Sequence, residues 1–293
     1  MTGPRLGAHM SIAGGPANAL RRGHSIACDA IQLFTHAPNR WKAPALTTEQ
    51  VDEFHRVRRH TGIDAIVVHS PYLINLGSPD EGLWRRSIDA LIDDLVRCQR
   101  LGVVDYVLHP GAHMGAGVES GLARVARGLD AALCALDDDA LRILLETTAG
   151  QGTGLGHRFE QLVAIIDMAR MGHQLGVCLD TAHVMAAGYE FGDAESYAAM
   201  WAHFDGVIGL ERLRTIHLND SQRERGSRVD RHEHIGKGSV GLEAFRLLVN
   251  DRRLWRAPML LETPKTPDLA DDVANLKLLR GLLNKDRPVD DTT

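Results

Sequence analysis

Short apolar runs recur along the chain, and each is followed by a longer segment with helical periodicity. Residues 66–68 and 143–145 are apolar at consecutive positions, which is typical of strands that are covered on both faces. The pattern predicts eight strands, at residues 6–10, 30–35, 65–70, 106–110, 142–147, 176–181, 214–220 and 258–263. Strands that alternate with helices in this way indicate an α/β protein with a parallel sheet.

The segments between these strands have the three- and four-residue apolar spacing of amphipathic helices. Thr47 and Gln50 form a predicted capping box before the first such helix. Further helices are predicted over residues 80–101, 158–171, 194–209, 242–249 and 269–283. Eight strand–helix units in 293 residues match a (β/α)8 TIM barrel, which needs about 250 residues. A doubly wound open sheet is the alternative. We expect one domain over residues 1–284 and a frayed tail at residues 285–293.

Ionisable residues end most of the predicted strands. They are His9, His69, His109, Glu146, Asp180, His217 and Glu262, and His183, Asp230 and His232 follow in the adjoining loops. In a barrel the carboxyl ends of the strands converge on one face, where active sites form. Carboxylates gathered there are costly to bury unless protons or cations compensate them. Imidazole and carboxylate together suit zinc, so the sequence predicts a metal centre on this face.

The loop that contains Asp230, His232 and His234 has a spacing of its own. These residues are two apart, and in an extended segment such residues point to the same side. They can therefore face one point, together with His217 from the preceding strand. A solvated surface loop is the alternative interpretation for Asp230 and His232 when they are taken alone.

Composition narrows the function classes. A formal net charge of −5 argues against an indiscriminate nucleic-acid binder. The four cysteines are widely spaced, which argues against disulfides and a thiolate zinc site.

The apolar runs are too short for a membrane span, and the first residues lack the apolar core of a signal peptide, so we expect a cytoplasmic protein with no membrane partner. The glycines of residues 150–156 do not match Gly-x-Gly-x-x-Gly, so no nucleotide cofactor is expected. No obvious interface stripe is present, and a monomer is expected.

Six motifs occur in order along the chain. They are GAHMS (7–11), HSPYLINL (69–76), HPGAH (109–113), ETTAGQG (146–152), DTAH (180–183) and GSRVDRH (226–232). With them the chain resembles the endonuclease IV family, whose members are trinuclear-zinc apurinic/apyrimidinic (AP) endonucleases of base-excision DNA repair with a xylose-isomerase-like TIM barrel. The resemblance extends from about residue 5 to residue 263.

The resemblance implies three zinc ions and nine protein ligands, with Mn²⁺ possible at one site. His69, His109 and Glu146 would hold the first ion. Glu146 would bridge to a second ion bound by Asp180, His217 and Glu262, and His183, Asp230 and His232 would hold the third. Glu146, as the bridging ligand of the hydroxide, and Glu262 are the expected catalytic residues. His9, His113 and His234 would orient ligands. Three Zn²⁺ would offset the formal charge of −5.

The implied substrate is double-stranded DNA with an abasic site. Hydrolysis of the phosphodiester 5′ to the lesion would leave a 3′-hydroxyl and a 5′-deoxyribose phosphate. Tyr72 and Leu73 would wedge into the duplex, and Arg228 and Arg231 would contact phosphates. The family commonly has an arginine where this chain has Asn39, so Asn39 or the neighbouring Arg40 would fill the gap at the lesion.

Two other functions fit parts of the pattern. A metal-dependent sugar isomerase or epimerase of the same barrel superfamily is the first, but that class generally uses fewer ligands. A lesion-binding protein without turnover is the second, but it would be expected to lack a ligand, and every implied ligand is present.

Overall fold

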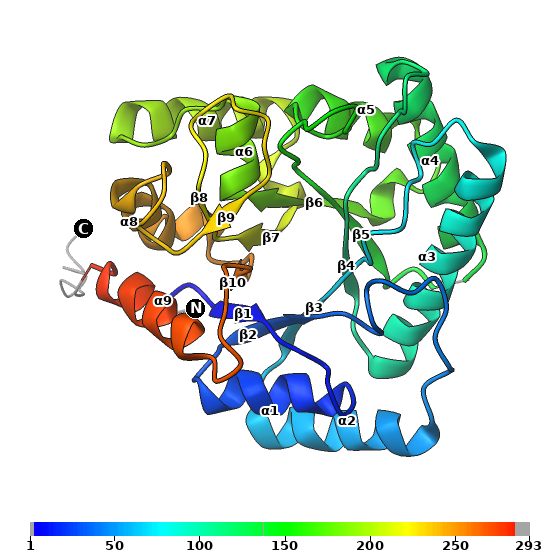
Figure 1. Ribbon diagram of the computed structural model, residues 1–293, viewed down its shortest axis with the longest axis horizontal. Coiled ribbons are helices and arrows are strands. Elements are labelled where there is room, and N and C mark those ends of the chain that lie inside the picture. Colours follow the sequence, from blue (N-terminus) through cyan, green and yellow to red (C-terminus); the bar gives the residue numbers. More distant parts are fainter. Residues whose placement is uncertain (1–2, 137, 285–293) are drawn as a thin grey trace, which may run out of the picture.

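Eight parallel strands close into a barrel in the computed structural model, which describes residues 3–136 and 138–284 (Figure 1). The strands are β1 (Leu6–His9), β2 (Ala30–Leu33), β3 (Ala65–His69), β4 (Asp105–Leu108), β5 (Arg142–Glu146), β6 (Leu175–Asp180), β7 (Leu213–His217) and β10 (Met259–Leu261). Each pairs with its neighbours in chain order, and β10 pairs with β1 to close the circle. The predicted TIM barrel is confirmed, whereas the predicted frayed tail lies outside the described residues.

The helices surround this barrel (Figure 1). They are α1 (Ala17–Ser25), α2 (Thr48–Thr61), α3 (Glu81–Leu101), α4 (Val118–Cys134), α5 (Phe159–Met168), α6 (Thr181–Ala187), α7 (Ala194–Val207), α8 (Leu242–Asn250) and α9 (Ala270–Gly281). Single 3₁₀ turns are η1 (Gly172–Gln174), η2 (Leu210–Arg212) and η3 (Arg252–Leu254). No helix in the described part of the chain is both long and apolar enough to cross a membrane.

The predicted capping box at the start of α2 is confirmed. The Thr47 side chain accepts a hydrogen bond from the Gln50 backbone N–H at 3.3 Å, and the Gln50 side chain accepts one from the Thr47 N–H at 3.0 Å. At the other end of the helix, Gly62 adopts the left-handed conformation, with φ of 70°. Both ends therefore use the local chemistry that the sequence contains.

The predicted strand ends differ from the observed ones by one or two residues, except at one strand, where the difference is three. The strand predicted over residues 214–220 ends at His217, and β8 (Asp220–Ser221) instead pairs antiparallel with β9 (His232–Glu233). The physical reason is the buried Asp220 carboxylate, which accepts hydrogen bonds from the N–H groups of Gly236 and Val240, both at 2.8 Å. It draws the chain into a loop over the barrel, and this loop contains Asp230 and His232.

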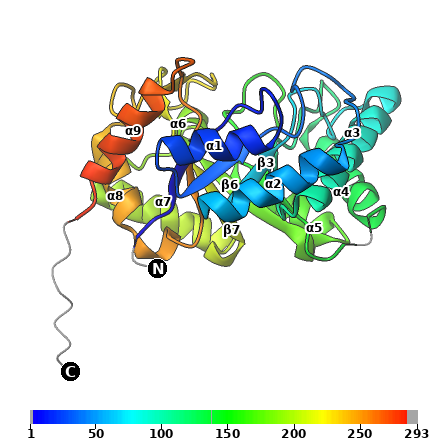
Figure 2. The same ribbon diagram turned by 90° about the horizontal axis from the view of Figure 1, so that it is seen from below.

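Side-chain alternation along the strands divides the barrel interior into levels. The middle level is largely apolar and contains Ala30, Val67, Val107, Leu144, Cys178 and Leu260. Gly7 lies at this level because a side chain there is impossible: an added Cβ would stand 1.7 Å from the Ala30 carbonyl oxygen. The charged residues of the interior thus lie at the two ends of the barrel, and the buried Thr215, which pairs with Cys178, is a polar residue at the middle level. Figure 2 shows the loop around β8 and β9 (yellow) on the side opposite the start of the chain.

Candidate metal centre

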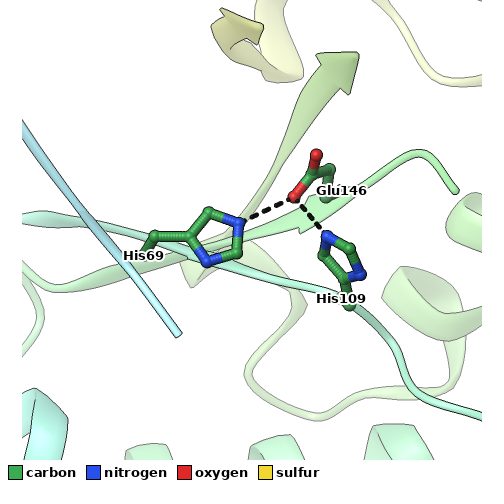
Figure 3. Close-up of side chains that lie close together, drawn as sticks. All are labelled: His69, His109 and Glu146. Atoms are coloured by element: carbon green, nitrogen blue, oxygen red, sulfur yellow. Dashed lines mark hydrogen bonds and ion pairs between the residues drawn. The ribbon is translucent and has the colours of Figure 1, made fainter. Parts of the chain in front are cut away.

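Glu146 is the central residue of the polar end of the barrel. Its carboxylate is fully buried at the end of β5. The Nε2 atoms of His69 and His109 lie 3.0 and 2.9 Å from one of its oxygens (Figure 3). His69 ends β3, and His109 follows β4 directly. Three neighbouring strands thus place two imidazoles around one carboxylate oxygen, which is the arrangement expected of the first predicted metal site.

A second group shares Glu146 from its other side. Nδ1 of His217 lies 2.9 Å from the second Glu146 oxygen, 3.3 Å from Glu262 Oε2 and 3.8 Å from Asp180 Oδ2. One ligand atom from each of these four residues falls within 4.8 Å of all the others. Asp180 and His217 are the last residues of β6 and β7, and Glu262 follows β10. The carboxylate of Glu146 therefore lies between the two groups.

A third group lies beneath the β8–β9 loop. His183 Nε2 is 3.1 Å from Asp230 Oδ2, and His232 Nε2 is 3.3 Å from Asp230 Oδ1. Nδ1 of His183 donates to the Thr147 carbonyl at 2.8 Å, which leaves Nε2 facing Asp230. Helix α6 fixes this ring, because Asp180 caps the helix by accepting from the His183 N–H at 2.8 Å.

Neighbouring charges shift the pKa values of the residues in these groups. Burial acts to raise the pKa of Glu146, but the imidazoles of His109 and His217 outweigh it and hold this pKa well below its ordinary value. Burial acts to lower the pKa of His183, whereas Asp180 and Asp230 raise it well above its usual range. Burial acts to raise the pKa of Asp230, yet the adjacent His183 lowers it to about 2. The site is therefore a set of imidazole–carboxylate pairs, and metal binding there would displace protons.

The donor set fits divalent metal ions. Buried polar atoms normally have hydrogen-bond partners. The buried Nε2 atoms of His183 and His232 make no hydrogen bond of acceptable geometry, although Asp230 oxygens lie near both. Nitrogen and carboxylate oxygen atoms that converge on a point without bonding each other are arranged as metal ligands are. All nine predicted ligands are gathered in these three groups.

The three other histidines predicted to orient ligands differ in position. His9 lies in the site, with Nδ1 3.5 Å from Glu262 Oε1, and burial lowers its pKa. His113 instead accepts a hydrogen bond from the Gly117 N–H at the start of α4. His234 contacts the amide of Asn275 at 3.1 Å. Of the three, His9 alone contacts a predicted ligand through its side chain in the described part of the chain.

Sequence reasoning missed Gln32, a fully buried residue of β2. Its Oε1 accepts a hydrogen bond from His217 Nε2 at 2.8 Å. Its Nε2 donates to Glu262 Oε1 at 2.5 Å and lies 2.9 Å from His9 Nδ1. The amide therefore keeps the proton on Nε2 of His217 and leaves Nδ1 free for a metal. A glutamine within the otherwise apolar run of residues 30–34 was the signal that could have found it.

Two further polar residues were also missed. Asn219 donates to Asp180 Oδ2 at 2.7 Å and accepts from the Glu262 N–H at 2.8 Å, so it joins two predicted ligands. Lys265 donates to the His9 carbonyl at 2.6 Å. Both follow strand ends, as the predicted ligands do, but their types gave no reason to separate them from ordinary loop residues.

A cavity of about 410 Å³ opens above the three groups. Predicted ligands form its floor, and Phe34, Tyr72, Arg231 and Lys265 line its walls. Tyr72 is 77% exposed, and its ring centroid lies 6.0 Å from that of Phe34. A cationic, partly aromatic rim over buried carboxylates and imidazoles suits an anionic ligand with flat groups.

The other predicted DNA contacts lie on nearby loops. Leu73 is half-buried beside Tyr72, whereas Asn39 and Arg40 are exposed in the loop between β2 and α2. Arg228 is exposed and adopts a left-handed backbone conformation, with φ of 54°. Arg231, beside Asp230, reaches the cavity rim. The structure thus places Tyr72 and Arg231 at the cavity, and the cavity lining does not include Leu73, Asn39, Arg40 or Arg228.

The barrel and the groups at its carboxyl end define a class of protein. Residues 20–280 match the family described as xylose isomerase-like TIM barrel, and the chain belongs to that class. A structure titled D-tagatose 3-epimerase-like protein shares this fold, with a TM-score of 0.71 and 18% identity over 95% of this chain and 96% of that one.

Closer relatives define the family within this class. The probable endonuclease 4 of Chloroflexus aggregans is 49% identical over 280 residues, which cover 96% of this chain and 98% of that protein. The probable endonuclease 4 of Geobacter sulfurreducens is 46% identical, with 96% and 95% covered. The crystal structure of endonuclease IV from Thermus thermophilus has a TM-score of 0.84 and 38% identity, and it covers 95% of this chain and 98% of that one. This chain belongs to the endonuclease IV family, and the family resemblance of the sequence motifs is confirmed.

Proposed function

We propose that this protein is a metal-dependent AP endonuclease of DNA repair, which hydrolyses the phosphodiester 5′ to an abasic site. The products would be a 3′-hydroxyl and a 5′-deoxyribose phosphate. The observation that carries the proposal is the convergence of nine imidazole and carboxylate ligands in three groups beneath one cavity. Family membership supports the DNA substrate.

Three zinc ions fit these groups best, in the assignment that the sequence motifs imply. Zinc supplies Lewis-acid catalysis and lowers the pKa of bound water from about 15.7 to about 7. Nitrogen ligands favour zinc over magnesium or calcium. Mn²⁺ is the alternative at the third group, where Asp230 is 42% exposed. A monomeric, cytoplasmic enzyme completes the proposal.

Each part of the chain has a separate task in this reaction. Glu146 holds the first two groups of ligands at a fixed separation, since its two oxygens face different imidazoles. Arg231 gives the rim positive charge to receive the scissile phosphate, and beside it Lys265 is paired with Asp272 at 3.3 Å. An abasic nucleotide leaves the helix stack cheaply, which lets an enzyme select it by flipping. The exposed Tyr72 ring is placed to occupy the space that this nucleotide leaves.

A defined duplex tests the proposal. Purified protein loaded with zinc is incubated with a labelled duplex that contains one tetrahydrofuran abasic analogue. We expect a single cut 5′ to the analogue, which cannot undergo β-elimination and so excludes a lyase. A zinc-loaded sample that leaves this duplex intact but epimerises or isomerises a ketose would support the sugar-isomerase alternative, which otherwise rests on the shared fold alone.

Substitution of the shared carboxylate tests its role. Glu146→Gln is expected to remove cutting, a larger loss than the ~10–100-fold typical of residues that only orient a ligand. Binding to the abasic duplex, measured by fluorescence anisotropy, should largely remain because the rim residues are unchanged. Near-wild-type cutting by this variant would contradict the proposed role, and loss of the folded circular dichroism spectrum would mean that Glu146 is needed for folding.

A further inference from the structure

A second polar cavity lies at the opposite mouth of the barrel, around the amino ends of the strands. It has a volume of about 260 Å³, and the metal centre contributes no residue to it. Its charged lining residues are Arg5, Arg58, Arg142, Arg214 and Arg256, with Asp64 and Asp105. Five arginines and two aspartates leave a formal excess of three positive charges around the cavity.

Two of these arginines have carboxylate partners. Arg142 donates from Nε and Nη2 to the two oxygens of Asp105, at 2.8 and 3.1 Å. Nε of Arg58 lies 3.6 Å from Asp64 Oδ1. These pairs are neutral overall. They do not account for the positive charge of the cavity.

The other three arginines have no carboxylate partner among residues 3–136 and 138–284. The guanidinium of Arg5 donates to the Arg256 carbonyl, and that of Arg256 donates to the Leu210 carbonyl. Nε of Arg5 is buried and has no acceptor. An unpaired buried donor of a charged group is costly, so an anion in the cavity would relieve it.

Arg214 is turned toward this mouth by the local backbone. A register shift between Val177 and Cys178 places Arg214 opposite no partner residue in the β6–β7 pairing. Such bulges redirect a side chain. The stem of Arg214 then crosses Gly176, where an added Cβ would lie 3.0 Å from Arg214 Cγ and 2.8 Å from Leu144 Cδ2. The guanidinium has no hydrogen-bond or ion-pair partner in the described residues.

We propose that this cavity binds a small phosphate-type oxyanion, held by Arg5, Arg214 and Arg256. Guanidinium groups match the geometry of phosphate oxygens and bind them through paired charge-assisted hydrogen bonds. A cavity of about 260 Å³ admits free inorganic phosphate. The anion would stabilise the barrel because it binds the folded chain and not the unfolded one. This site is independent of the proposed endonuclease function.

Melting curves of the metal-loaded protein with increasing inorganic phosphate test the proposal, at constant ionic strength set with chloride. At 100 times its Kd, phosphate should raise the Tm by about 5 °C. Arg214→Gln should abolish most of this increase. Without phosphate the same variant should melt at or slightly above the wild-type temperature, because it removes repulsion among three arginines. Arg127→Gln, which removes an exposed arginine of α4, is the matched control and should respond as the wild type does.

Calorimetric titration separates this site from the metal centre, to which phosphate can also bind. We expect Arg214→Gln to lose one binding event and to keep its nuclease activity. A phosphate response that is equal in wild type and Arg214→Gln would overturn the proposal, as would a variant destabilised equally with and without phosphate. A third outcome would also overturn the proposal. If a short duplex without an abasic site binds in place of phosphate, and Arg214→Gln loses this binding, the cavity is a site for the DNA backbone.

Discussion

At the scale of single residues, the candidate metal centre includes side chains that contact predicted ligands without being predicted ligands themselves. Gln32 is the clearest case. Its amide oxygen accepts a hydrogen bond from His217, and its amide N–H groups bond to Glu262 and His9. Glutamine is common and does not ionise, so the residue type alone gave no reason to predict this role. The convergence of the predicted ligands was foreseeable, because histidine and carboxylate residues at successive strand ends meet at one face of a barrel.

Gln32→Leu removes these three contacts at similar volume. We expect zinc to bind about 10–100-fold more weakly, since His217 loses the partner that fixes its tautomer. Competition with a chromophoric chelator measures the affinity directly. Gln174→Leu is the matched control: Gln174 is equally buried but donates to the carbonyls of Asp138 and Leu141. If both variants bind zinc as the wild type does, Gln32 is only a packing residue.

His36 forms a separate buried pair with Asp94, at 3.2 Å. The hydrogen bond to Asp94 raises the pKa of His36 above its ordinary value of 6.5. Because the folded pKa is raised, the stabilisation is complete below pH 6.5 and is lost as pH rises through the folded pKa. Urea unfolding at pH 6 should show His36→Gln to be about 1–3 kcal/mol less stable than wild type. The difference should shrink at pH 9, and a difference that grows with pH would contradict this pairing.

At the scale of secondary-structure elements, the strands and most helices followed from periodicity and from local end signals. The boundary of β7 did not, because Asp220 acts through backbone N–H groups 16 and 20 residues away. Helix α6 was not predicted either, since it has only seven residues and follows directly on the strand end at Asp180, which caps it. Local patterns thus identify elements that pack against the barrel. They do not identify elements whose ends are fixed by long-range polar contacts.

The capping box of α2 gives a prediction at this scale. Thr47→Ala removes the side-chain acceptor for the Gln50 N–H and should lower the free energy of unfolding by about 1 kcal/mol. Thr47→Ser keeps the acceptor and should cost much less. Denaturant unfolding measures both. Equal stability of the two variants would show that the box contributes nothing measurable in this helix.

At the scale of the whole molecule, the candidate metal centre involves most of the barrel. Its predicted ligands come from the ends of β3, β5, β6 and β7, from the residues that follow β4 and β10, and from α6 and the β8–β9 loop. Ions bound there would join segments separated by up to about two hundred residues of chain, as His69 and Glu262 are. The sequence predicted this convergence only through the fold, since no ligand pair except Asp180 with His183 and Asp230 with His232 is local.

Metal removal should therefore lower global stability. We expect dialysis against a chelator to reduce the Tm by several degrees, because ions bind the folded chain alone and their removal leaves buried carboxylates uncompensated. Re-addition of zinc should restore the Tm and the nuclease activity together. Scanning calorimetry measures the Tm, and the duplex assay measures the nuclease activity. A Tm that is insensitive to chelation, with activity lost, would mean that the ions contribute to chemistry without holding the barrel together.

The four predicted acidic ligands, Glu146, Asp180, Asp230 and Glu262, have a consequence for protein that has not taken up metal. His183, whose pKa is raised despite burial because Asp180 lies beside it, holds a proton that balances part of their charge. Uptake of ions would expel such protons. The protein should therefore acidify an unbuffered solution as it is loaded, and a mildly acidic solution would favour the metal-free form.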